Sequence, residues 1–254
     1  MQAQAVYATQ GMPLRNQIER LLDRAPTEEA QGHVHAVIVP NSNLLEGGEV
    51  SARVFAAIRN QPCRYVVVVA PSLSGTFKRL NVCSLDRYRT PLGEVPISAK
   101  LRDELCDEDD DIFVGDEGHF HTHGADAQLP FLQSVFDEFE IVPIVMGNEE
   151  PDLCRELGHA IGEIMYNRTT LLVACTSILE GSAEDVALLR QRLEDRDVSG
   201  LMALVNSDRM EIQGKGALLV ALMASMRRNA KHVTVTDCTA PEGRTPGFLG
   251  AYIT

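Results

Sequence analysis

The stretch that decides the fold is RYVVVVAPS, residues 64–72, which contains four consecutive valines. A short unbroken run of β-branched residues is typical of a parallel strand buried on both faces, because burial on both sides removes the alternation with polar residues. Similar apolar runs occur at 35–40, 139–146 and 169–176. We therefore expect these four runs to form one mainly parallel sheet that is covered on both faces.

Helical patterns alternate with these runs, as in βα units. Residues 12–24 predict a helix with Leu14, Ile18, Leu21 and Leu22 on one stripe. Further helices are expected at 49–60, 98–105, 129–139, 151–165, about 183–206 and 214–228, and further strands at 80–85, 231–237 and 248–254. Without a repeat or a long linker, the chain predicts one α/β domain over residues 1–254, a three-layer sandwich. Ligands of such sheets bind beyond the carboxyl ends of the strands, here near 40–43, 70–73 and 174–177.

Composition limits the partners. With 36 acidic and 23 basic residues the net charge is -13, so nucleic acid and anionic membrane are not expected as partners. Residues 1–12 have no signal-peptide pattern, and no run approaches the roughly 20 apolar residues of a membrane span. The six scattered cysteines fit reduced thiols in a cytoplasmic protein. The acidic residues 107–111 predict a solvated loop.

The segment DEGHFHTHGAD, residues 116–126, contains the densest group of side chains that could bind a metal or transfer protons. Alternating histidines at 119, 121 and 123 share one face of an extended chain and can bind a transition metal or move protons. The alternative is a polar loop whose histidines bond to backbone and cap a helix that begins near Asp126. Cys175 follows the apolar run at 169–174 and is a candidate nucleophile, against the simpler interpretation of a buried, inert thiol.

Several segments, in order along the chain, resemble the Memo-like family, and more narrowly protein B of the AmmeMemoRadiSam system. The segments are LRNQIERLL (14–22), AVIVPNSN (36–43), EGGEVSARVFAAI (46–58), RYVVVVAPSLSG (64–75), YRTPLGEVPIS (88–98), HFHTHGADAQLPFL (119–132), EIVPIVMG (140–147), LLVACTSI (171–178) and FLGAYIT (248–254). YRTPLGEVPIS, similar to the family's Thr-Pro-Leu-Gly segment, is the most specific. The resemblance implies a fold similar to the class III extradiol dioxygenases.

The resemblance also implies a metal site, and this chain departs from it. Asn41, Leu73 and Gln213 stand where the family has histidine, histidine and cysteine, so the chain is a divergent member. The family's Ser-Ser-Asp and following histidine correspond to Ala174-Cys175-Thr176 and Leu179. Leucine cannot bind a metal, and a neutral amide is a poor ligand for borderline ions. We therefore expect the inherited metal site to be lost and no cofactor to be held.

The leading hypothesis is a non-catalytic or metal-independent binding protein. Its cleft for a small polar ligand would be lined by Asn41, Asn43, Ser72, Leu73, His123, Thr176 and Gln213. The resemblance suggests a radical SAM protein and an AMMECR1-like protein as partners. The alternative is a metal-dependent, oxidoreductase-like enzyme that holds iron or another divalent transition metal at His119, His123 and Asp126; a structural subunit with an unused cleft is the third. The resemblance implies that His119 and His123 lie near Asn41, Leu73 and Gln213 around this cleft.

Overall fold

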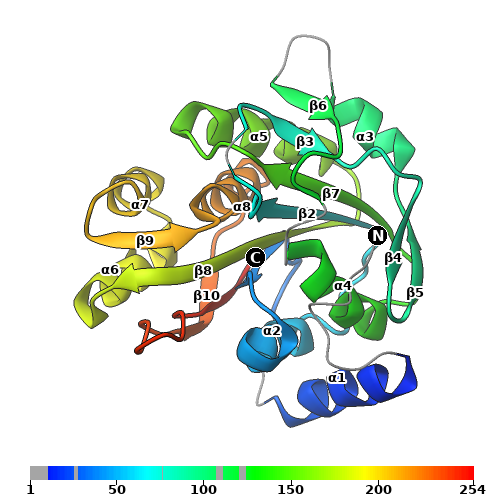
Figure 1. The fold of residues 1–254 in the computed structure, drawn as a ribbon, viewed down its shortest axis with the longest axis horizontal. Coiled ribbons are helices and arrows are strands. Elements are labelled where there is room, and N and C mark those ends of the chain that lie inside the picture. The colour runs from blue at the N-terminus through cyan, green and yellow to red at the C-terminus, as the bar shows by residue number, and fades with distance from the viewer. Residues whose placement is uncertain (1–10, 26–27, 76, 107–110, 120–123) are drawn as a thin grey trace.

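The computed structural model describes residues 11–25, 28–75, 77–106, 111–119 and 124–254. At its centre the four apolar runs that were predicted as strands lie side by side (Figure 1). Their order is β1 (Ala36–Pro40), β8 (Thr170–Gly181), β2 (Tyr65–Pro71) and β7 (Glu140–Met146), and all three pairings are parallel. The prediction of a parallel central sheet is confirmed.

Shorter strands extend this sheet to nine. On one side β11 (Leu249–Ile253) pairs antiparallel with β1, and β10 (Val233–Cys238) pairs antiparallel with β11. On the other side β3 (Leu80–Val82) runs antiparallel to β7, and β6 (Ile112–Val114) runs parallel to β3. The sheet is therefore mainly parallel in the middle and mixed at its edges.

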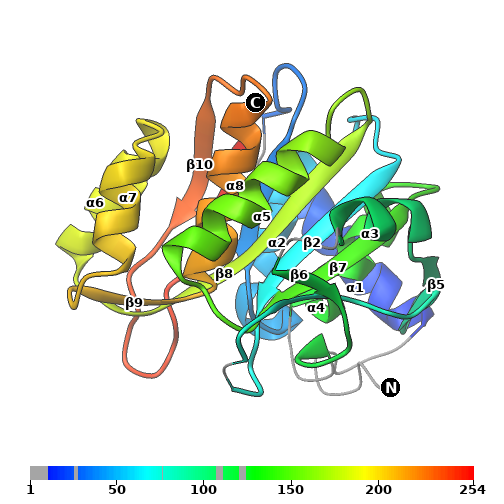
Figure 2. The same ribbon diagram turned by 90° about the horizontal axis from the view of Figure 1, so that it is seen from above.

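Helices cover both faces of the sheet (Figure 2). One face packs against α1 (Met12–Arg24), α2 (Leu44–Ala57) and α4 (Gly124–Val135). The other packs against α3 (Ala99–Leu105), α5 (Pro151–Ile164), α6 (Ala183–Glu194), α7 (Val198–Val205) and α8 (Lys215–Arg227). The result is the expected three-layer α/β sandwich.

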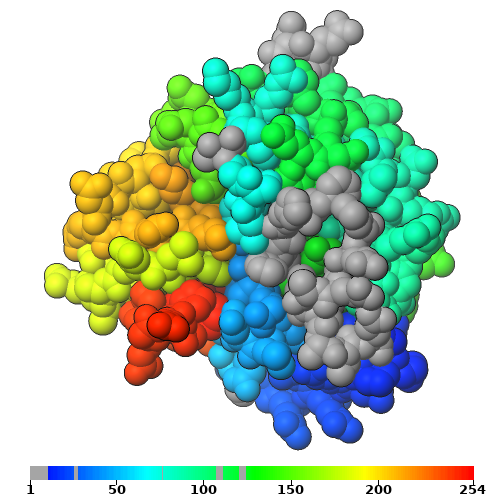
Figure 3. Space-filling model, viewed as in Figure 1, coloured from blue at the N-terminus to red at the C-terminus, as the bar shows by residue number. Residues whose placement is uncertain are grey.

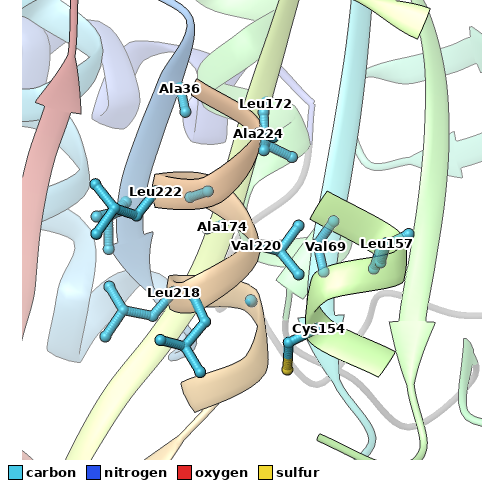
Figure 4. Packing of buried hydrophobic residues seen from close by; sticks show 14 of the residues in the cluster. Ala36, Val69, Cys154, Leu157, Leu172, Ala174, Leu218, Val220, Leu222 and Ala224 are labelled. Atoms are coloured by element: carbon cyan, nitrogen blue, oxygen red, sulfur yellow. The ribbon is translucent and has the colours of Figure 1, made fainter. Parts of the chain in front are cut away.

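The valines of β2 show why both layers are required. Val67 and Val69 belong to the core on the α5 and α8 side, whereas Val66 and Val68 belong to the core on the α1, α2 and α4 side. All four are buried, and each contributes roughly 1.5–3 kcal/mol relative to an exposed side chain. Figure 4 shows α8 lying across the sheet, with Val220 beside Val69 and α5 alongside.

Three helices differ in their boundaries from the sequence prediction, and the first is the helix expected over 129–139, which is α4 and runs from Gly124 to Val135. Helix α2 starts at Leu44, five residues before the expected start at residue 49, because the Asn43 side chain caps it by accepting bonds from the amides of Leu45 and Glu46. The helix therefore includes Gly47 and Gly48. The helix expected over 183–206 is two helices, separated at Arg196, whose φ is 57°. Ser98 lies at the start of α3 as expected, but its side chain makes no capping bond.

A hairpin, strand β6 and one further strand were not predicted. Residues 87–96, for which no strand was expected, form the hairpin of β4 (Arg87–Thr90) and β5 (Gly93–Pro96). Strand β9 (Met210–Gln213) pairs antiparallel with the far end of β8, which runs on to Gly181. Of the acidic residues 107–111, only Asp111 lies within the described part of the chain, where it is exposed. Within the described ranges no helix is both long and apolar enough to cross a membrane.

Candidate functional site

The strand ends bring three of the predicted cleft residues together. Asn41 follows β1, and its backbone amide donates to the carbonyl of Thr176 in β8, at 3.0 Å. The Asn41 side chain donates through Nδ2 to Oε1 of Gln213, also at 3.0 Å. Thr176 Oγ1 donates to the backbone carbonyl of Gln213 at 3.0 Å. The carboxyl ends of β1 and β9 therefore meet Thr176, in the middle of β8, at one polar cluster.

Gly214 allows Gln213 to reach this cluster. Its φ is 79°, in the left-handed region that favours glycine. A Cβ there would lie 2.2 Å from the carbonyl oxygen of Cys175. The chain can therefore run close against β8 and begin α8 at Lys215 directly after the polar cluster.

Two buried acceptors at this end of β1 have no hydrogen-bond donor among the described residues: Asn41 Oδ1 and Gln128 Oε1. Gln128 belongs to α4 and donates through Nε2 to the carbonyl of Pro40 at 2.9 Å. Buried polar atoms are normally paired, so such atoms are candidates for contact with a bound molecule. Sequence reasoning missed Gln128, although a glutamine between Ala127 and Leu129 on an otherwise buried stretch was a usable signal.

The metal that the resemblance implies does not fit these residues. The Nδ2 of Asn41 and the Oε1 of Gln213 are already hydrogen-bonded to each other. Leu73, half-buried after β2, offers no donor atom at all. Among the described residues, no group of three or more His, Cys, Asp or Glu side chains is placed to hold a metal ion. Amide oxygens suit hard cations better than iron, copper or zinc.

His119 is buried and takes a structural position. Its Nε2 donates to the backbone carbonyl of Asn81, at 2.9 Å, which assigns the proton to Nε2 because a carbonyl can only accept. Asn81 in turn donates through Nδ2 to the carbonyl of Glu117 at 3.1 Å. Burial lowers the pKa of His119 and keeps the ring neutral. This bond ties His119 to β3; His121 and His123 lie outside the described residues, so the predicted proximity of His123 to Asn41 stays a prediction.

Asp126 lies in the first turn of α4 and holds the β4–β5 hairpin. Tyr88 Oη donates to Asp126 Oδ1 at 2.9 Å. Burial raises the pKa of Asp126 to about 6, although the bond from Tyr88 lowers it. Burial also raises the pKa of Tyr88, which therefore stays protonated and donates. One oxygen of the candidate catalytic carboxyl is thus engaged in packing the hairpin.

The other predicted residues occupy the same end of the sheet with different roles. Cys175 is fully buried within β8, and burial raises its pKa, which favours the inert thiol because the thiolate is the nucleophile. Asn43 uses its side-chain oxygen to cap α2. Ser72 is half-buried after β2, with its Oγ 3.2 Å from Ser74 Oγ.

A separate cavity of about 240 Å³ opens between the ends of β2 and β7. We call it the β2–β7 pocket; its lining includes Ser72, Met146, Asn148, Glu149, Asn206 and Lys215. In Figure 3 the cyan turn after β2 lies beside the blue segment after β1 and the orange start of α8. Sequence reasoning missed this pocket, although Glu149 and Glu150 directly follow the strand end.

Comparison with known proteins agrees with the resemblance. A family model described as Memo-like protein matches residues 1–242. A MEMO1 family protein of Nitrosopumilus maritimus is 24% identical over 225 residues, 83% of this chain and 82% of the relative. A MEMO1 family protein of Sulfurisphaera tokodaii is 24% identical over 243 residues, 90% and 86% of the two chains. A crystal structure of an uncharacterised Escherichia coli K12 protein shares the fold, with a TM-score of 0.58 at 15% identity, covering 87% of this chain and all (100%) of that one.

Proposed function

Because this chain belongs to the Memo-like protein family, we propose that it is a metal-independent member that binds a small polar ligand where the carboxyl ends of β1 and β2 lie beside the middle of β8. The observation that carries the proposal is the hydrogen bond from Asn41 Nδ2 to Gln213 Oε1. It joins two of the three positions at which the resemblance puts metal ligands. Both side chains are neutral amides joined by one hydrogen bond, so neither position carries a negative charge that needs a cation.

The same pair still offers polar contacts to an organic molecule. Asn41 Oδ1 has no donor among the described residues, and neither does Gln128 Oε1. Gln213 Nε2 donates to no other described side chain or backbone group. An acceptor and a donor without a protein partner in the described part of the chain, close together at strand ends, are typical of a site that orients a small polar ligand.

The metal-dependent enzyme gains no support from the two described members of its predicted triad. His119 Nε2 donates to the backbone of β3, and Asp126 Oδ1 accepts from Tyr88. Both atoms therefore serve packing. The partner hypothesis follows from the family: we propose that a radical SAM protein and an AMMECR1-like protein associate with this chain in the cytoplasm.

Calorimetric titration with zinc, ferrous and cupric ions tests the proposal. The parent protein is expected to show no saturable binding of one ion per chain. The matched variant is His123→Ala, which removes the remaining predicted ligand of the alternative site. One-to-one binding in the parent that disappears in His123→Ala would contradict the proposal and revive the metalloenzyme.

A further inference from the structure

The β2–β7 pocket is lined by two groups of opposite charge, Lys215 and Glu149, which form no ion pair with each other within 4.0 Å. Lys215 begins α8, and its Nζ donates to Asn206 Oδ1 at 2.8 Å, a neutral partner. Among the described carboxylates none lies within 4.0 Å of the Lys215 ammonium. An ammonium has three donors, so two remain for a ligand.

Glu149 supplies the negative charge from the loop after β7. Its Oε1 accepts from the backbone amide of Gly216 at 3.0 Å, which caps the start of α8. That bond accounts for one oxygen only. Oε2 accepts from no described residue, and Glu149 lines the cavity together with Lys215. A purely structural cap explains neither the free oxygen nor the cavity beside it.

We propose that the β2–β7 pocket binds a small zwitterion, with an amine held by Glu149 and an acid group held by Lys215. The inference goes beyond the proposed function, because this pocket shares only Ser72 with the predicted cleft. A cation without an acid group would be repelled by Lys215, and an anion without an amine would be repelled by Glu149 and the adjacent Glu150. A molecule that carries both groups satisfies both ends. The cavity, about 240 Å³, limits the ligand to a small metabolite.

Binding by this arrangement depends on pH near neutrality. Burial raises the pKa of Glu149 to about 7, while the Gly216 amide and the Lys215 charge act in the opposite direction. The other titratable groups near Glu149 are Glu150 and the Cys154 thiol of α5, whose pKa burial raises to about 12, so that it stays neutral. The amine is therefore held by an ionised carboxylate at pH 8 and by a largely protonated one at pH 6.

Isothermal titration with three probes of similar length tests the inference: 4-aminobutyrate, butylamine and butyrate. We expect 4-aminobutyrate alone to bind the parent protein one to one at pH 8. Glu149→Gln and Lys215→Met each remove one charge and are expected to weaken this binding at least about 10-fold, since bonds to charged groups are the strong ones. The matched controls are Glu28→Gln and Lys100→Met at exposed positions outside the pocket, and they should bind as the parent does.

A pH series separates ligand contact from a structural role. Binding to the parent should weaken between pH 8 and pH 6, and no such change should remain in Glu149→Gln, because the probe's own groups do not titrate in that range. Absence of binding, equal binding of butylamine or butyrate, or unchanged affinity in both variants would overturn the inference. Thermal unfolding of each variant without probe shows that it is folded. The outcome of the metal titration is independent of the 4-aminobutyrate titration. Metal binding by the parent protein would overturn the proposed function and would leave the inference about this pocket standing.

Discussion

Asn41 at the end of β1 donates its side-chain amide to Gln213 at the end of β9, at 3.0 Å and across 172 residues of sequence. Two neutral amides thus close on each other where the family resemblance places a histidine and a cysteine. The bond also fixes the start of α8 relative to the central sheet, because Gln213 is followed by Gly214 and Lys215.

Gly214→Ala should lower the free energy of unfolding by about 2–4 kcal/mol, because the new Cβ meets the Cys175 carbonyl in a left-handed backbone conformation. Urea denaturation measures the loss. Gly243→Ala is the matched control: its φ is 62°, but nothing lies within 4 Å of the added Cβ. The control should lose only about 1 kcal/mol. Equal losses in the two variants would show that the close approach at Gly214 contributes nothing.

His119→Ala should lower the free energy of unfolding by roughly 2–4 kcal/mol, since it removes a buried ring and leaves the Asn81 carbonyl without its donor. The loss should be the same with and without a chelator. Because burial lowers the pKa of His119, the ring stabilises the fold above the unfolded value of 6.5, and this contribution is lost as the pH falls below it. The parent should therefore lose more stability than the variant between pH 7 and pH 5. If a chelator destabilised the parent as much as the substitution does, His119 would be a metal ligand.

The Glu149→Gln variant should become more stable relative to the parent protein as the pH rises. The pKa of Glu149 is about 7 in the folded protein, above its ordinary 4.5, so the folded state holds the proton more tightly than the unfolded state. Stability from this group is complete below pH 4.5 and is lost as the pH rises through 7. Relative to the parent, the variant should gain about 1–3 kcal/mol between pH 4.5 and pH 8, measured by urea denaturation. A constant difference across that range would mean that Glu149 ionises normally.

Tyr88→Phe should lower the free energy of unfolding by about 1–2 kcal/mol, because Asp126 loses its donor in a buried setting. The pKa of Asp126 should also rise further above about 6, since the bond from Tyr88 now holds it down. Urea denaturation at pH 5 and pH 7 measures both effects. Tyr166→Phe is the control, since Tyr166 is 58% exposed, and it should change stability by under about 0.5 kcal/mol. Equal effects would show that the Tyr88 bond does not hold the hairpin.

The central sheet could be predicted because its strands are decided locally. Four consecutive valines at 66–69 require burial on both faces wherever they are placed. Strand β9 could not be predicted in this way, because the four residues MEIQ have no apolar run of their own. They become a strand by pairing with the far end of β8. The break between α6 and α7 was missed because a left-handed arginine at 196 has no sequence signal.

The site was only partly predictable, because its contacts join residues that lie far apart in the sequence. The contact of Asn41 with Gln213 followed from the family resemblance, because no periodicity relates residues so far apart. The buried surroundings of Glu149 arise from α8, whose Gly216 lies 67 residues further along the chain. Likewise, Asp126 is bonded by Tyr88, 38 residues before it. Sequence patterns identify such residue types, but the partners that change their pKa come from tertiary structure.

Whether the strand-end site holds a metal is decided by elemental analysis after mild dialysis of the parent protein and of the triple variant Asn41→His, Leu73→His, Gln213→Cys. The parent is expected to contain iron, copper and zinc far below one ion per chain. The triple variant, which restores two imidazoles and a thiolate at these positions, is expected to approach one ion per chain. Near-equimolar metal in the parent would contradict the account.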